Sequence, residues 1–247
     1  MNSPKNSSSV AFVTGYIGLK ASARIPTKPS QYDGYFITNN KWVYYRLKLS
    51  KWTPIFIENT LDKLFDNPTE ELIETFKNIK GVDKITRQYF FSRASKSLKL
   101  YPQEFIPKKY DYLVWFDNKF NVNIKGTIQT IKDWPPNVSI MLHRHPFVND
   151  IRGEFKEAML QERYILDKKN YLDYIEENVS KGLSSEHYNH FQTGYLLYNM
   201  NHDDTKHIQK IWHEHIKRCG INCQISFNFV AQMFREFIGE YIYDIHE

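Results

Sequence analysis

The stretch KKYDYLVWFDNKF (Lys108–Phe120) decides the fold of this chain. Residues 112–116 form an unbroken apolar and aromatic run of strong β-propensity, which predicts a buried strand. Asp117 then places a charge at the end of that strand, and Asn118 and Lys119 follow it. A strand without polar alternation is typical of a parallel sheet that is covered on both faces.

Strand and helix patterns alternate along the rest of the chain. Strands are expected around residues 10–13, 35–37, 53–59, 137–143 and 193–200, and residues 41–52 are expected to be extended. Helices are expected at 67–81, 87–100, 126–134, 149–166, 171–182, 204–220 and 224–238. This alternation predicts an α/β fold, with a mostly parallel central sheet flanked by helices. We expect one domain over residues 10–247, after a disordered lead-in of residues 1–9.

The composition narrows the class of protein. The 247 residues are 41% hydrophobic and 25% charged, which is ordinary for a soluble globular domain. No apolar run approaches the ~20 residues that span a bilayer, and the first residues lack the apolar core of a signal peptide. We therefore expect a soluble, cytoplasmic protein. The net charge of +5 favours an anionic ligand, but without any run of five basic residues we expect no nucleic-acid partner. Cys219 and Cys223 are expected to be free thiols.

Asp117 has two interpretations on position alone. Ligands of open α/β sheets bind at the carboxyl ends of the strands, which would place Asp117 in the binding crevice. Asp and Asn are also common turn residues, so Asp117 and Asn118 could simply form the turn after the strand.

Four stretches share their order and spacing with a known family. They are SRASKSLKLYPQEFIPKKYDYLVWFDNKF (92–120), HRHPFVNDIRGEFKEA (143–158), YLDYIEENVSKGL (171–183) and IWHEHIKRCGINCQISFNFV (211–230). The first, with Tyr-Asp-Tyr, an apolar strand and Trp-x-Asp, resembles the sugar-nucleotide site of GT-A-type glycosyltransferases. Together they resemble a plant and microbial family of glycosyltransferases linked to cell-wall and mucilage polysaccharides. The resemblance implies a GT-A-like single domain that uses a nucleotide sugar.

The resemblance also implies a divalent metal ion, Mn²⁺ or Mg²⁺, with Asp117 as its ligand. Such an ion, or Lys and Arg side chains, would neutralise the diphosphate that leaves. The chain departs from the pattern at Lys119, where many GT-A enzymes have the second Asp of an Asp-x-Asp pair. Cys223 also replaces the Asp of an Asp-Gln motif in which Gln224 is retained. Both departures remove negative charge, and Lys119 is either a substitute cation or a solvated loop lysine.

Two segments are expected to bind the nucleotide. The glycine turn in VTGYIG (residues 13–18) could approach a uracil and ribose, with Tyr16 stacked on the base, or be a plain turn. Arg93, Lys96 and Lys99 share one side of a helix, which either contacts the diphosphate or is a solvated basic face. The residues expected to contact the nucleotide are Thr14, Gly15, Tyr16, Arg93, Lys96 and Lys119.

The acidic and histidine residues after the 137–143 strand are expected to serve catalysis and the acceptor. Asp150 and Glu154 lie one helical turn apart, and either could act as a general base, although Asp150 could simply cap the helix. The candidate catalytic residues are therefore Asp117, Asp150 and Glu154. The candidate substrate-binding residues are His145, Arg152 and Gln224. We expect His213 and His215 to lie on the surface of their helix.

The sequence therefore predicts a glycosyltransferase that moves a sugar from a nucleotide-sugar donor, a UDP-sugar, to a glycan acceptor. Two alternatives stay open. The first is a non-catalytic module that binds a sugar nucleotide or a glycan, which Lys119 and Cys223 favour. The second is a metal-dependent hydrolase that uses Asp117, Asp150, Glu154 and the histidines.

Overall fold

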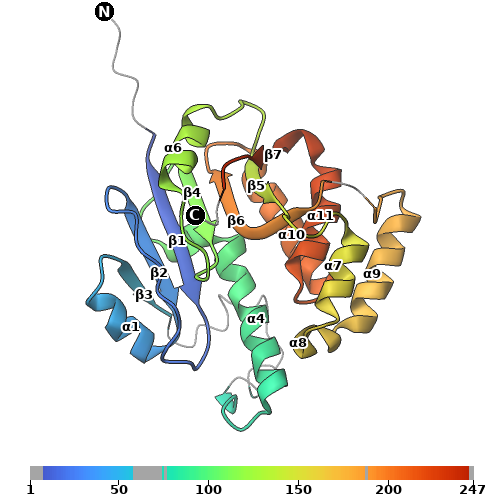
Figure 1. Cartoon of the computed structure of the whole chain (residues 1–247), viewed down its shortest axis with the longest axis horizontal. Coiled ribbons are helices and arrows are strands. Elements are labelled where there is room, and N and C mark those ends of the chain that lie inside the picture. Colours follow the sequence, from blue (N-terminus) through green and yellow to red (C-terminus); the bar gives the residue numbers. More distant parts are fainter. Residues whose placement is uncertain (1–7, 58–73, 75–76, 187–188, 245–247) are drawn as a thin grey trace, which may run out of the picture.

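A seven-stranded mixed sheet forms the centre of the computed structural model, which describes residues 8–57, 74, 77–186 and 189–244 (Figure 1). The strands are β1 (Val10–Tyr16), β2 (Asp33–Thr38), β3 (Thr53–Phe56), β4 (Tyr112–Phe116), β5 (Ile140–Arg144), β6 (Phe191–Asn199) and β7 (Ile238–Tyr241). The helices are α1 (Lys41–Lys48), α4 (Lys84–Leu100), α5 (Pro102–Phe105), α6 (Ile124–Lys132), α7 (Ile151–Ala158), α8 (Glu162–Ile165), α9 (Lys168–Ser180), α10 (Asp204–Cys219) and α11 (Cys223–Met233), followed by the 3-10 turn η1 (Arg235–Phe237).

The strand order is β3-β2-β1-β4-β6-β5-β7. Strands β3, β2, β1 and β4 pair in parallel, and so do β5 and β7. Strand β6 runs antiparallel to both β4 and β5. The predicted α/β domain with a mostly parallel sheet flanked by helices is confirmed, and the direction of pairing changes beside β4.

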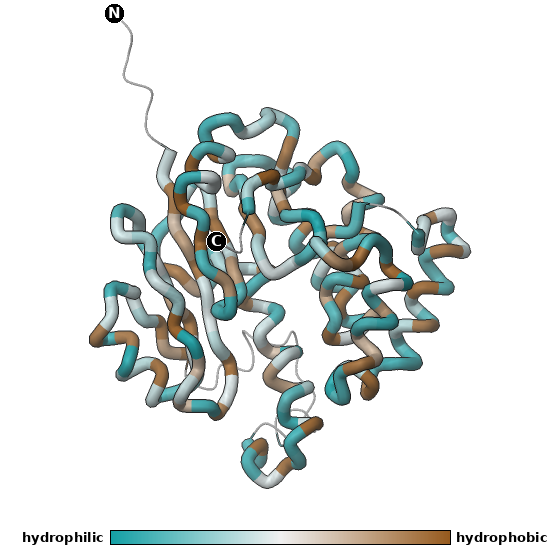
Figure 2. The backbone as a smooth tube through the Cα atoms, in the orientation of Figure 1, coloured by the Kyte–Doolittle hydropathy of each residue, from teal (hydrophilic) through white to brown (hydrophobic). Residues whose placement is uncertain are grey.

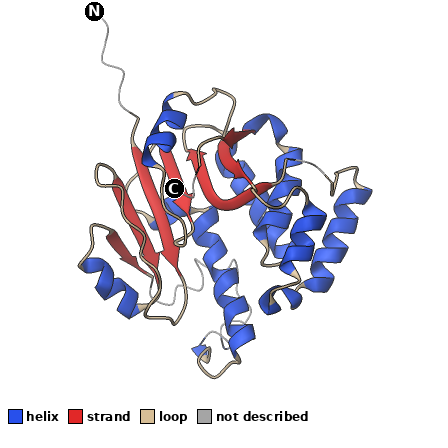
Figure 3. Ribbon diagram, viewed as in Figure 1, coloured by secondary structure: helices blue, strands red, loops and turns tan. Residues whose placement is uncertain are grey.

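Helices cover both faces of the sheet (Figure 3). Leu113 and Trp115 of β4 pack in one core with residues of α4, α5, α10 and α11. Val114 and Phe116, which alternate with them, pack on the other face with residues of α1 and α6. This burial on both faces explains why β4 is apolar along its whole length.

A second layer of helices lies outside α10 and α11. Residues of α7 and α9 form a core of their own with Cys219, Ile225 and Phe229. Figure 2 shows hydrophilic and hydrophobic segments alternating along these helices, as expected when only one side of each is buried. No helix in the described ranges combines the length and the apolar character needed to cross a membrane.

The N-terminal lead-in and one predicted helix are only partly described. Residues 1–7 lie outside the described residues, and Ser9 is held by hydrogen bonds from its backbone N–H and its hydroxyl to Asp111 Oδ2. The helix predicted over residues 67–81 also lies largely outside them. Of the other predicted helices, that at 87–100 is confirmed as α4, which begins earlier because Asp83 caps it by accepting from the N–H groups of Ile85 and Thr86.

The extended structure predicted for residues 41–52 is wrong, because α1 occupies residues 41–48. Asn40 caps this helix by accepting hydrogen bonds from the N–H groups of Trp42 and Val43. Val43 and Leu47 are buried four residues apart, whereas Trp42 is exposed. The aromatic residues had suggested a strand, and the cap and the helical spacing of the buried residues outweigh them.

The single helix predicted over residues 149–166 is broken. Helix α7 ends at Ala158, and a turn over residues 159–161 separates it from α8. The break lets α8 pack against α4, where Arg163 Nη1 donates to Ser92 Oγ at 3.0 Å.

The last predicted helix, residues 224–238, also ends early. Helix α11 stops at Met233, and residues 238–241 form β7 beside β5. The β-branched and aromatic residues Ile238 and Tyr241 suit this edge strand.

The surface placement predicted for His213 and His215 is wrong, since both side chains are buried. Tyr174 hydroxyl lies 2.6 Å from His215 Nδ1, and Tyr101 hydroxyl lies 3.3 Å from His213 Nδ1. Although residues two apart diverge on a helix, α10 lies between two layers, so more than one of its sides is covered.

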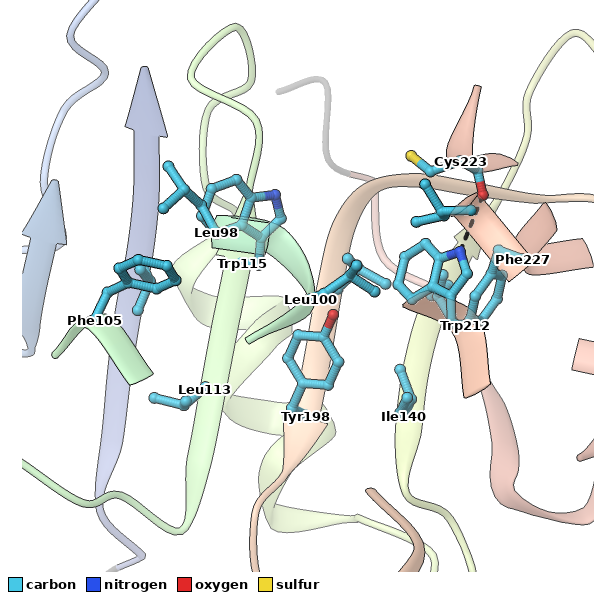
Figure 4. Packing of buried hydrophobic residues seen from close by; sticks show 14 of the residues in the cluster. Leu98, Leu100, Phe105, Leu113, Trp115, Ile140, Tyr198, Trp212, Cys223 and Phe227 are labelled. Carbon is cyan, nitrogen blue, oxygen red and sulfur yellow. Dashed lines mark hydrogen bonds between the residues drawn. The ribbon is translucent and has the colours of Figure 1, made fainter. Parts of the chain in front are cut away.

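Trp212 joins α10 to the start of α11 (Figure 4). Its side chain is fully buried, and its indole Nε1 donates to Cys223 O and Ser226 Oγ, both at 3.2 Å. Its ring also packs edge-on against Phe227, with the ring centroids 4.6 Å apart. Trp212 therefore fixes the position from which α11 begins.

We predict that Trp212→Ala lowers the free energy of unfolding by about 3–5 kcal/mol, because it opens a cavity in the core. Trp42→Ala is the matched control, because Trp42 is 70% exposed. Its effect should stay within about 0.5 kcal/mol. Urea denaturation of both variants measures the difference, and similar losses in the two would contradict this account of the core.

Candidate functional site

A cavity of about 710 Å³ lies at the carboxyl ends of β1 and β4. Helix α4 forms one wall, and α8 and the start of α11 contribute to the others. Seven of the residues expected from the sequence line it: Gly15, Tyr16, Lys96, Asp117, Lys119, Glu154 and Gln224. The crevice expected from the parallel sheet is therefore present, and Asp117 lies in it.

Gly15 and Thr14 shape the cavity from within β1. A Cβ atom on Gly15 would lie 2.8 Å from the carbonyl oxygen of Ile37 and 3.0 Å from Leu98 Cδ1. The backbone oxygen of Ile37 in β2 therefore leaves no room for a side chain at this position. Thr14 is fully buried and donates to the carbonyl oxygen of Phe116 at 2.6 Å, so it joins the ends of β1 and β4 and does not line the cavity.

Asp117 is held at the end of β4 by a lysine of α4. Its Oδ1 lies 3.1 Å from Lys99 Nζ and accepts a hydrogen bond from Trp115 Nε1 at 3.2 Å. Burial alone would raise the pKa of Asp117, but the charges of Lys99, Lys119 and Lys96 outweigh it and hold the pKa below its ordinary value. Asp117 also forms the turn, since its carbonyl accepts from Phe120 N–H. The two interpretations of Asp117 are therefore compatible.

The thiol of Cys223 faces the same lysines. Its Sγ lies 4.0 Å from Lys99 Nζ and 3.2 Å from Thr193 Oγ1. Burial would raise the pKa of this thiol, but Lys96 and Lys99 outweigh it and lower the pKa. Burial also lowers the pKa of Lys96. Cys219 is free as well, but burial raises the pKa of its thiol well above the ordinary value.

Glu154 is buried at the far side of the cavity and holds two amide side chains. Its Oε1 accepts from Asn222 Nδ2 at 2.8 Å, and its Oε2 accepts from Gln224 Nε2 at 2.7 Å. His190 Nε2 lies 3.4 Å from Oε2. Burial would raise the pKa of Glu154, but His190 and Asn222 outweigh it and lower the pKa. Gln224 Oε1 in turn accepts from the backbone N–H of Thr193, so the Gln224 amide is fixed at both ends.

Four further candidates lie outside the cavity lining. Asp150 Oδ1 accepts from Gly153 N–H at 2.6 Å, which is the helix-capping role left open above. Arg152 donates to Ser185 Oγ, and His145 Nδ1 accepts from the N–H of Val148. Burial lowers the pKa of His145, a shift that the charge of Glu154 opposes. Arg93 is exposed on α4.

Sequence reasoning missed the contribution of α8. Arg163 and Tyr164 line the cavity beside α4, and Arg163 donates to Tyr164 hydroxyl at 3.1 Å. Both lay within the predicted long helix, so their spacing gave no signal. Asn222 was missed too, although an Asn directly before a helix is a recognisable cap, and its Oδ1 accepts from Gln224 N–H.

These residues do not fit a divalent metal ion. Asp117 Oδ1 is already shared by Lys99 and Trp115, and an ammonium group at 3.1 Å would repel a dication bound to the same oxygen. Lys119, two residues after Asp117, adds a positive charge to the same cavity and lowers the pKa of Asp117. Within the described ranges, no group of three His, Cys, Asp or Glu side chains is placed to hold a metal ion.

Comparisons with known proteins relate the fold to glycosyltransferases. No protein-family model and no curated protein sequence matches the chain. The structure is similar to mouse xyloside xylosyltransferase 1, with a TM-score of 0.53 and 12% identity over 94% of this chain and 84% of that one. Matches to the bifunctional WbbM glycosyltransferase and to GlyE of Streptococcus pneumoniae have TM-scores of 0.44, with 12% and 9% identity. They cover 97% and 95% of this chain, but 40% and 45% of those proteins. The fold is GT-A-like.

We predict that Cys223 reacts with a small thiol reagent such as methyl methanethiosulfonate at a lower pH than an ordinary thiol. A depressed folded-state pKa means that the thiolate, the reactive form, is present at lower pH. The pH profile of modification, followed by mass spectrometry, measures this.

Cys219 is the internal control, because it is buried outside the cavity lining. Cys223→Ser should abolish the fast reaction, and Cys219→Ser should leave it unchanged. If modification of Cys223 becomes fast only at the pH expected for a free thiol, or at a higher pH, the result would contradict the influence of Lys96 and Lys99 on its pKa.

Proposed function

We propose that this protein transfers a sugar from a nucleotide-sugar donor, a UDP-sugar, to a glycan acceptor. The observation that carries the proposal is the cationic and aromatic cavity at the carboxyl ends of β1 and β4 in a GT-A-like fold. Its volume lies within the range of small-molecule sites, which is about 300–1,000 Å³.

We assign the nucleotide to the side of the cavity formed by β1 and α4. Tyr16 offers an aromatic ring for the base, next to the glycine turn. Lys96 and Lys119 would then face the diphosphate. When the bond between the sugar and the diphosphate breaks, negative charge develops on the diphosphate oxygens, and positioned cations stabilise that charge.

We assign the sugar to the side formed by α11. The Gln224 amide, fixed by Glu154 and by the Thr193 backbone, is available to hydrogen-bond the transferred sugar or the acceptor. Because both carboxylate oxygens of Glu154 already accept hydrogen bonds from amides, we assign Glu154 to holding Asn222 and Gln224 instead of to proton transfer.

One observation favours a second candidate, a module that binds a sugar nucleotide without turnover. Asp117 Oδ1 is paired with Lys99, and both carboxylate oxygens of Glu154 accept from amides, so these oxygens are already engaged and a general base is not evident among them. The metal-dependent hydrolase has no such support, since Asp150 caps α7 away from the cavity.

We predict that UDP or a UDP-sugar raises the melting temperature more than ADP or NAD does, because a ligand that binds only the folded state stabilises it by mass action. A thermal-shift series with these compounds measures the preference. Equal shifts across all the nucleotides would remove the reason for a uridine donor. Release of UDP that depends on an added glycan acceptor would separate the transferase from the binding module.

A further inference from the structure

We infer that the cavity binds the diphosphate of its nucleotide ligand with Lys96, Lys119 and Arg163 in place of a divalent metal ion. The inference rests on the proposed function and specifies how the same site handles the charge of its ligand. Three observations lead to it: the engagement of the carboxylates, the lack of ion-pair partners for these cations, and their placement on three separate elements around the cavity.

The carboxylates that line the cavity are poorly placed to capture a cation. Asp117 is neutralised by Lys99, and Glu154 is used by two amide groups. The remaining one, Glu162, is exposed on α8. A dication bound at Asp117 Oδ1 or at Glu154 would therefore have to displace an existing ion pair or dismantle a buried hydrogen-bond network, and both are costly.

The positive charges of the lysines and the arginine that line the cavity, in contrast, are available to an anionic ligand. Across the described part of the chain, no acidic side chain forms an ion pair with Lys96, Lys119 or Arg163. Arg163 is held by neutral groups, since it donates to Ser92 Oγ, Gln161 Oε1 and Tyr164 hydroxyl. Its guanidinium is therefore positioned without losing its charge, which suits recognition of a phosphate group.

The placement of these cations matches a ligand with several negative charges. Lys96 comes from α4, Lys119 from the turn after β4, and Arg163 from α8, so they surround the cavity from three elements. Lys96 lies one turn before Lys99 on the same side of α4. Because Lys99 already neutralises Asp117, an anion entering beside Lys96 meets a site with net positive charge.

The test is isothermal titration of the full chain with UDP, in excess EDTA and then in excess Mn²⁺. We expect UDP to bind in EDTA and to bind no more tightly in Mn²⁺. Lys96→Met, Lys119→Met and Arg163→Met should each weaken binding by about 10-fold or more, the loss expected for one charge-assisted hydrogen bond. Lys84→Met is the matched control, because Lys84 is exposed on α4 and lies outside the cavity lining, and the affinity of this variant should not change.

Binding of UDP that EDTA abolishes and Mn²⁺ restores would overturn this inference while supporting the proposed function. Unchanged affinity in all three cavity variants, with their melting temperatures preserved, would also overturn it. If UDP does not bind in either condition, the proposed function fails, and this inference fails with it. A variant that loses its native circular dichroism spectrum is replaced by the corresponding Gln substitution at the same position.

Discussion

A carboxylate at the end of a strand that is buried on both faces has to be neutralised or solvated, and here Lys99 neutralises Asp117 from helix α4. The contact requires α4 to lie close to the sheet, and Ala94 and Leu98 of α4 are buried in the same core as Leu113 and Trp115 of β4. Once α4 is in place, its exposed turns form a wall of the cavity, and Lys96 faces the interior. The ion pair between Lys99 and Asp117 therefore joins α4 to the end of β4 at the cavity.

The sequence was most informative where burial and backbone pattern agree. The apolar run that ends at Asp117 predicted a central strand, and the alternation of strands and helices predicted the sheet. It failed where tertiary packing decides between two local patterns. Residues 41–48 are rich in aromatic residues, but the Asn40 cap and the packing of Val43 make them a helix. Strand β7 pairs along an edge of β5, and the strand preference of Ile238 and Tyr241 is realised only because that edge is there.

For the candidate site, the sequence located residues better than it located their partners. Asp117 and Lys96 lie in the cavity as expected, whereas Arg93, three residues before Lys96, lies outside it. Helical spacing alone cannot separate these basic residues, because their depth in the crevice depends on how α4 tilts across the sheet. Arg163 entered the site only because the chain turns after α7. Such a turn is difficult to foresee in a segment that is otherwise favourable to helix.

The position of β7 has a consequence for how the molecule is made. Strand β5 pairs with β6 on one edge and with β7 on the other, and β7 follows β5 by almost a hundred residues. During synthesis, β5 leaves the ribosome long before residues 238–241 do, so one of its edges stays open while the chain is extended. Unpaired edges of this kind are prone to associate with other chains. This edge of β5 is therefore a site of possible association with other chains until β7 pairs with it.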